Sequence, residues 1–148
     1  MAETGDLIKL YSGQILDLAA SISHIDRLEA PDASQMKRSA LCGSTVTVDL
    51  RIADGVVTDF GQDVKACALG QASASVLGNA VIGLPLQTIR QGRDQLRAML
   101  KEDGPAPDAP FEGLAVLEPA KAYKNRHDSI LLAFDATVEA MEGLEATG

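Results

Sequence analysis

Two neighbouring stretches of the chain alternate apolar and polar residues, which is the pattern of a half-buried β-strand. From Thr45 to Ile52 every even-numbered residue is apolar and every odd-numbered residue is polar. Apolar residues at Val56, Phe60 and Val64 continue the alternation after an Asp-Gly pair. Two alternating runs joined through Asp-Gly predict a β-hairpin over residues 44–65.

The apolar positions also restrict the loop of this hairpin. Residues that pair directly across two strands lie on one face of the sheet, so a regular pairing that keeps even-numbered apolar residues together needs an even sum of residue numbers. A two-residue loop would split the apolar face. We therefore expect a three-residue loop at 53–55 with Gly55 in the left-handed conformation, which pairs Ile52 with Val56, Val48 with Phe60 and Ser44 with Val64.

The same pairing, continued to the open end of the hairpin, brings the two cysteines of the chain together. Cys42 falls opposite Ala66, one position from Cys67. Neighbouring positions across two strands lie about 5 to 8 Å apart, so the two sulfurs can reach a common ion or each other. Cys67 also lies where a strand passes into a helix, and the amides at a helix start favour a thiolate. The pair is the predicted functional centre.

Helical spacing of apolar residues predicts the other elements. We expect helices over Leu7 to Ile22, Ala68 to Gly83, Leu86 to Lys101 and Arg126 to Leu144, and a short helix within Phe111 to Tyr123. The segment Ser23 to Ala40 has no period, so we expect a connection without regular structure there, and the prolines of Asp103 to Pro110 predict a loop. This order predicts a single α+β domain over residues 1–148.

Composition and charge limit the kinds of partner that the protein can bind and indicate its cellular compartment. The chain has 148 residues, of which 46% are hydrophobic, enough for a real core. Its net charge of −8 argues against a nucleic-acid partner and against an anionic membrane surface. No apolar run approaches the roughly 20 residues of a membrane span, and the N-terminus lacks the pattern of a signal peptide. We expect a cytoplasmic protein whose cysteines are thiols or metal ligands rather than a disulfide.

Two sulfurs do not complete a metal site, because zinc and iron-sulfur iron take four donors. The further donors that we expect are His127 and Asp128, at the start of the last helix, with His24 and Asp26 as others. A single histidine is more often a surface or capping residue, and cysteines are also found as small buried hydrophobic side chains. No phosphate-binding loop, dinucleotide motif, Cys-x-x-Cys or nucleophile turn is present, so apart from thiol transfer by Cys67 we expect no enzyme.

The hairpin and its flanks resemble a known family. The segments that carry the resemblance are Leu10-Tyr11, Ile15-Leu16-Asp17, Leu41-Cys42-Gly43-Ser44, Asp54-Gly55, Ala66-Cys67-Ala68, Gln71-Ala72-Ser73-Ala74-Ser75 and Arg126 to Phe134. They are similar to the U-type iron-sulfur cluster scaffolds, which include NifU N-terminal, IscU-like and SufU-like proteins. The resemblance implies a three-stranded sheet with helices packed on one side. It also implies that a cysteine desulfurase supplies sulfur, and that a [2Fe-2S] cluster is built and passed to acceptor proteins.

The resemblance further implies a ligand set, from which this chain departs at two positions. The family site consists of three cysteines and the aspartate of a Cys-Gly-Asp motif. Cys42 and Cys67 match the first two cysteines, whereas Ser44 stands in place of the aspartate and Ser129 in place of the third cysteine. Hydroxyl groups are poor ligands for iron or zinc at neutral pH.

Three functions stay open at this point. In the first, the chain holds iron, a [2Fe-2S] cluster or zinc through Cys42 and Cys67, with His127 or Asp128 and with ligands from a second subunit of a homodimer. In the second, no metal is bound, and Cys67 accepts persulfide sulfur that Cys42 resolves. In the third, the chain is a regulatory interaction module of the assembly system.

Overall fold

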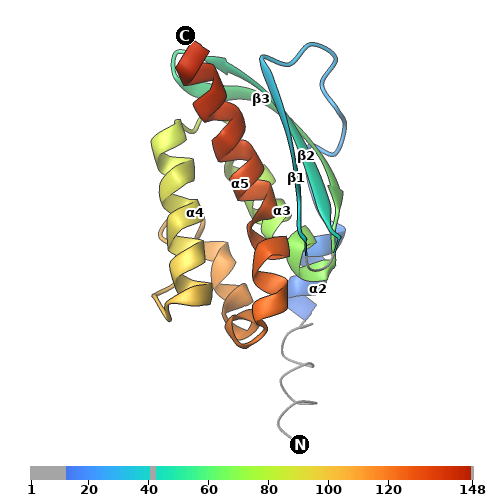
Figure 1. Cartoon of the computed structure of the whole chain (residues 1–148), viewed down its shortest axis with the longest axis vertical. Helices are drawn as coiled ribbons and strands as arrows, with labels where there is room; N and C mark the ends of the chain where they lie inside the picture. Colours follow the sequence, from blue (N-terminus) through green and yellow to red (C-terminus); the bar gives the residue numbers. More distant parts are fainter. Residues whose placement is uncertain (1–12, 41–42, 148) are drawn as a thin grey trace, which may run out of the picture.

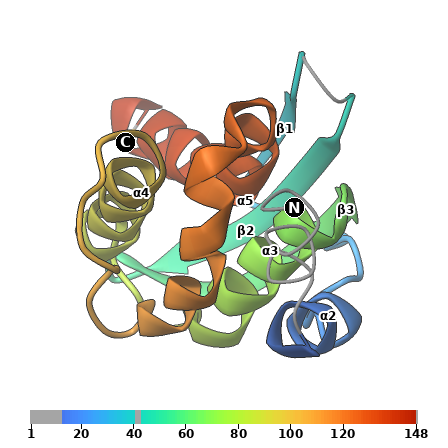
Figure 2. The same ribbon diagram turned by 90° about the horizontal axis from the view of Figure 1, so that it is seen from below.

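Three antiparallel strands and a set of helices on one side of them make up the chain. The structure is a computed structural model that describes residues 13–40 and 43–147. Its elements are α2 (Gly13–Ala20), β1 (Ala33–Arg38), β2 (Thr45–Ala53), β3 (Val56–Lys65), α3 (Ala68–Ala80), α4 (Leu86–Lys101), the 3-10 helix η1 (Glu112–Ala122) and α5 (Lys124–Thr147). The strand order is β1-β2-β3, with α3, α4 and α5 on one side of the sheet (Figures 1 and 2). The predicted α+β class and three-stranded sheet are confirmed.

The hairpin between β2 and β3 has a two-residue turn, so the three-residue loop expected at 53–55 is wrong. Ala53 pairs with Val56, and the two residues between them, Asp54 and Gly55, have φ angles of 53° and 80°. Two successive left-handed residues are typical of a type I′ turn, whose twist matches that of the strands.

A bulge restores the apolar face that a two-residue turn would otherwise split. The ladder shifts between Arg51 and Ile52, so that β3 gains one residue there, and beyond the bulge Leu50 pairs with Phe60. Val48 pairs with Gln62, so its expected pairing with Phe60 is wrong by two residues. Ile52 pairs with Val57 and Val64 pairs with Val46, so the expected pairs Ile52–Val56 and Ser44–Val64 are also wrong, by one and two residues. The parity argument assumed a regular ladder, and one extra residue changes the parity.

The strand β1 occupies part of the segment for which no regular structure was expected. It pairs antiparallel with β2, from Ala33 opposite Leu50 to Arg38 opposite Thr45. Its sequence has no alternating apolar residues, and Met36 is 55% exposed. An edge strand of this kind is held by backbone pairing on one side, and the hydrophobic pattern carries no signal of it.

The helical predictions are largely confirmed. The helix α4 has the expected bounds, α3 begins at the expected residue, and the proline-containing segment 103–110 is a loop. The last helix begins two residues earlier and continues three residues further than expected. The first expected helix is present over Gly13–Ala20, and its earlier part lies outside the described residues.

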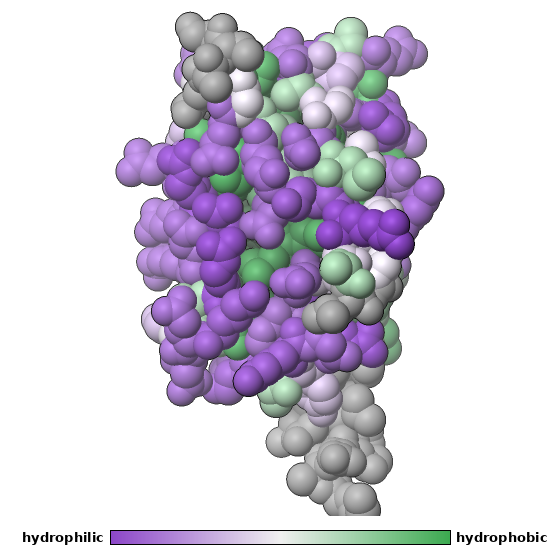
Figure 3. All heavy atoms as spheres, viewed as in Figure 1, coloured by the Kyte–Doolittle hydropathy of each residue, from purple (hydrophilic) through white to green (hydrophobic). Residues whose placement is uncertain are grey.

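The core lies between the sheet and the helices. On the last helix, the apolar residues Ile130, Phe134, Val138 and Met141 are each at most 1% exposed, and α5 packs against α3, α4, β1 and β2. The face of the molecule in Figure 3 is mostly hydrophilic, with small separate apolar patches. No helix in the described part of the chain is long and apolar enough to cross a membrane.

One buried carboxylate ties the 21–32 segment to the sheet. The side chain of Asp49 is fully buried and accepts hydrogen bonds from Arg27 Nε and Nη2 at 2.5 and 3.0 Å, from Ser34 Oγ at 2.5 Å and from the Leu28 N–H at 3.1 Å. Burial by itself raises the pKa of this carboxyl, but the hydrogen bonds outweigh burial and lower the pKa of Asp49 below its ordinary value.

Candidate functional site

Cys67 lies at the junction of β3 and α3. It is the N-cap residue of α3, with extended backbone angles (φ −67°, ψ 170°), and its carbonyl accepts the Gln71 N–H at 2.9 Å. The side chain of Cys67 forms no cap bond and is partly exposed. The thiol therefore lies beside the positive end of α3 and within reach of a partner.

One buried hydroxyl group contacts this thiol, and a second buried hydroxyl group contacts the first. Ser129, in the second turn of α5, is 1% exposed, and its Oγ lies 3.6 Å from Cys67 Sγ. The Ser129 hydroxyl donates to Ser44 Oγ at 3.1 Å, and Ser44 directly precedes β2 and is 6% exposed. The fold thus joins three side chains that are 62 and 85 residues apart in the sequence.

The approach of α5 to Cys67 depends on Gly70, which the sequence analysis missed. A Cβ at Gly70 would lie 2.8 Å from Ser129 Oγ, 2.9 Å from Ala66 Cβ and 3.0 Å from the Ser129 carbonyl oxygen. Real Cβ atoms hardly ever approach other atoms this closely. The sequence held one signal of this role: a glycine in the first turn of an otherwise Ala-rich helix. Glycine is less favourable than alanine in a helix, so its presence there indicates close packing.

Cys42, which the hairpin register predicted to lie near Cys67, is outside the described residues. The residues that flank it close a short connection between β1 and β2. The Ser39 N–H donates to the Ser44 carbonyl at 2.8 Å, and the Gly43 N–H donates to the Ser39 carbonyl at 3.0 Å. This connection ends at Ser44, which contacts Ser129, and Gly43 has a left-handed φ of 71°.

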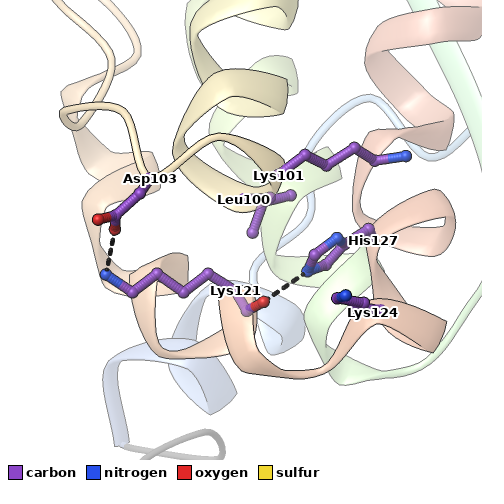
Figure 4. A pocket seen from close by; sticks show the side chains of 6 residues that line it. All are labelled: Leu100, Lys101, Asp103, Lys121, Lys124 and His127. Carbon is purple, nitrogen blue, oxygen red and sulfur yellow. Dashed lines mark hydrogen bonds and ion pairs between the residues drawn. The ribbon is translucent and has the colours of Figure 1, made fainter.

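His127 is turned toward η1. Its Nε2 lies 3.1 Å from the carbonyl oxygen of Ala120 and 3.1 Å from that of Lys121, and Figure 4 shows the second contact. Because both neighbours are acceptors, this nitrogen carries a hydrogen. The ring is 4% exposed and lines a pocket of about 420 Å³. The pocket is lined by Leu100, Lys101, Asp103, Lys121, Lys124 and His127. Cys67 and the two serines are not among its lining residues.

Asp128 is directed to α4, where its carboxylate lies 3.7 Å from Lys101 Nζ. His24 and Asp26 lie beside the edge of β3, where the Gln62 N–H donates to the His24 carbonyl at 2.7 Å. In residues 13–40 and 43–147, no group of three or more His, Cys, Asp and Glu side chains could hold a metal ion. The structure therefore does not bring these donors together around Cys67, and their role as ligands stays a prediction.

Comparison with known proteins identifies the family. The family model of the NifU-like N terminal domain matches residues 10–128. The chain belongs to this family. The match ends one residue before Ser129, so it includes the thiol and the Ser44 side of the site. The family predicted from the hairpin and its flanks is confirmed.

The relatives of this NifU-like chain span nearly its whole length. It is 26% identical over 133 residues to the iron-sulfur cluster assembly scaffold protein IscU of Thermotoga maritima, covering 90% of this chain and 93% of that protein. A nitrogen-fixing NifU-like protein (N-terminal) from Brucella abortus superimposes with a TM-score of 0.94 at 46% identity, covering 97% and 99% of the two chains.

A putative SUF-system scaffold from Fervidobacterium islandicum AW-1 has the same fold. It superimposes with a TM-score of 0.81 at 21% identity, covering 90% of this chain and 98% of that one. The NifU-like fold therefore persists where the sequences have diverged widely.

Proposed function

We propose that this NifU-like chain serves in iron-sulfur cluster assembly. It receives sulfur from a cysteine desulfurase on Cys67 and holds iron or a [2Fe-2S] cluster, as cargo for acceptor proteins, through Cys67 and Cys42. The observation that carries the proposal is the meeting of Cys67, Ser129 and Ser44 at the start of α3. These are the described positions at which the family resemblance expects ligands. The Thermotoga maritima relative, named as an assembly scaffold, supports the same role.

The sulfur step is an exchange of one S–S bond for another. The Cys67 thiolate attacks the terminal sulfur of the persulfide on the desulfurase, and a bond forms between Cys67 Sγ and that sulfur. The S–S bond of the donor breaks, and its electron pair leaves with the desulfurase thiolate. No oxidant or reductant is consumed. The partly exposed thiol at the start of α3 suits this attack.

The described donor set covers only part of an iron site. Iron in such clusters takes four donors, usually thiolates, whereas one thiol and two hydroxyls meet here. We infer that the cargo is held with the help of Cys42 and of donors from a second copy of the chain or from a partner. Cargo bound this way would be labile, which suits transfer to an acceptor.

Anaerobic reconstitution with iron and sulfide tests the cargo. We expect a visible charge-transfer band with matching iron and sulfide content in the dimer fraction, lost in Cys67→Ala and in Cys42→Ala. Ser73→Ala is a matched control, because it alters a buried α3 side chain that lacks a hydrogen-bond partner among the described residues. If no band forms in monomer or dimer, the chain does not carry a cluster.

A second candidate function is a sulfur carrier without metal. It is favoured because two of the three described side chains at the site are hydroxyls, which are poor metal ligands. In this case Cys67 holds the persulfide and Cys42 resolves it, in a reducing compartment such as the cytoplasm that keeps both thiols free. Exposure to a cysteine desulfurase and its substrate should add one sulfur atom to Cys67, as seen by mass spectrometry. Cys67→Ala should abolish the addition. No added sulfur, together with a formed cluster, would exclude the carrier.

A further inference from the structure

Ser129 and Ser44 form an ordered hydrogen-bond chain that ends on the sulfur of Cys67. The contacts are 3.6 Å from Cys67 Sγ to Ser129 Oγ and 3.1 Å from Ser129 Oγ to Ser44 Oγ. Both serines are at least nine-tenths buried, so water hardly competes for their hydroxyls. A buried hydroxyl costs free energy unless it is hydrogen-bonded. Because Gly70 has no side chain, it leaves the space that the Ser129 hydroxyl occupies.

The two hydrogen bonds that link Cys67, Ser129 and Ser44 can both reverse their donor and acceptor without movement of any non-hydrogen atom. When Cys67 is a thiol, its S–H donates to Ser129 Oγ, and the Ser129 hydroxyl donates to Ser44 Oγ. A sulfur anion has no proton to give and can only accept. The Ser129 hydroxyl then turns about its Cβ–Oγ bond and donates to the sulfur, while the Ser44 hydroxyl donates to Ser129.

We propose that Ser129 stabilises the Cys67 sulfur as a leaving group when sulfur is passed on, with Ser44 as the positioning residue that orients the Ser129 hydroxyl. The proposal rests on the proposed function of Cys67 as a sulfur carrier. In onward transfer, an acceptor thiolate attacks the terminal sulfur of the Cys67 persulfide and forms an S–S bond with it. The bond from that sulfur to Cys67 Sγ breaks, and its electron pair stays on Sγ, where Ser129 lies.

This placement makes the two half-reactions unequal. In release, Sγ is neutral before the reaction and gains negative charge in the transition state, so a fixed donor lowers the barrier. In uptake, the Cys67 thiolate carries its full charge before the reaction and loses charge as it attacks. The same hydrogen bond therefore does not accelerate uptake. We therefore expect the two serines to accelerate the release of sulfur from Cys67 and not its uptake.

The test measures release and uptake separately in the full chain carrying Cys42→Ala, so that only Cys67 reacts. The protein is loaded with glutathione persulfide, and release to excess 2-mercaptoethanol is followed by intact mass as the loss of one sulfur atom. We expect Ser129→Ala to slow release about tenfold, which corresponds to about 1.4 kcal/mol, without slowing uptake. Ser44→Ala should give a smaller loss. Ser73→Ala removes a buried α3 hydroxyl that has no hydrogen-bond partner in the described part of the chain, and it should change neither rate.

Two results overturn the proposal: release at the rate of the parent protein from folded Ser129→Ala, or equal slowing of release and uptake, which indicates a merely structural role. If the serine variants do not fold, the infrared S–H band of the Cys42→Ala protein decides. A band at the frequency of an unbonded thiol excludes the hydrogen bond to Ser129. If the parent takes up no sulfur from glutathione persulfide or from a desulfurase, it is the carrier function that fails, and the S–H band still tests the bond.

Discussion

Replacing Gly70 by alanine tests whether the close approach of α3 and α5 builds the site. The added Cβ would meet the Ser129 side chain at 2.8 Å, Ala66 Cβ at 2.9 Å and the Ser129 carbonyl oxygen at 3.0 Å. Ser129 Oγ can rotate away from the new methyl group, but it then leaves Cys67. The Ser129 carbonyl oxygen belongs to the backbone of α5 and cannot rotate away, so the two helices themselves must separate.

Two effects of opposite sign set the magnitude. Gly to Ala inside a helix stabilises by up to about 1 kcal/mol, and less at the first turn, where Gly70 lies. Overpacking costs about 1 to 3 kcal/mol. We therefore expect a net loss of about 1 to 2 kcal/mol and, for a chain of this size, a fall in melting temperature of about 2 to 8 °C.

The assay combines thermal unfolding with the rate of Cys67 alkylation in the Cys42→Ala protein. Gly143→Ala is the matched control, because this glycine also lies in a helix but a Cβ there meets nothing within 4 Å. The control should be as stable as the parent or more stable, with unchanged alkylation. Gly70→Ala with parental stability and parental Cys67 reactivity would refute the close-approach argument.

Three further predictions concern the buried carboxylate and the degenerate ligand positions. Asp49→Asn should lower the free energy of unfolding by about 1 to 3 kcal/mol, because it weakens several buried hydrogen bonds at once, whereas the exposed control Asp59→Asn should change it by less than about 0.5 kcal/mol in urea unfolding. Because the pKa of Asp49 is lowered in the folded chain, its stabilising contribution is complete above the unfolded-state pKa of about 4 and is lost as the pH falls below that value. Urea unfolding across this range should show that loss in the parent and a flatter profile in Asp49→Asn, and equal slopes would contradict it. The double variant Ser44→Asp with Ser129→Cys adds a carboxylate and a thiolate beside Cys67, so it should bind Zn²⁺ at least about tenfold more tightly than the parent in a chelator competition. A Ser73→Cys control should bind Zn²⁺ no more tightly than the parent. Equal affinities of the double variant and the parent would show that these positions do not form a ligand set.

Much of the local structure followed from short-range pattern. The bounds of α4 could be predicted because Pro85 and an apolar period of nearly four residues are local signals. The position of Cys67 between a strand and a helix was readable for the same reason. The family was also readable, because the cysteine-bearing hairpin and the Ala-Ser-rich segment after it are contiguous in the sequence.

The elements that escaped prediction depend on pairing rather than on pattern. The strand β1 exists because its backbone bonds to β2, and its side chains show no alternation. The bulge beside Arg51 adds one residue to β3 and converts the odd register set by the two-residue turn into the even register that the apolar positions require. Both features are set by hydrogen bonds between segments, which hydrophobic periodicity does not record.

The sequence by itself determined the α+β class, the family and the location of Cys67, because these rest on neighbouring residues. Only the tertiary structure decided what surrounds that thiol. It placed Ser129 and Ser44 in contact with each other and Ser129 against the sulfur, and it turned His127 toward η1. The physical reason is that helix packing sets these contacts: Gly70 lets α5 approach α3 closely enough for a hydroxyl 62 residues away to reach Cys67 Sγ.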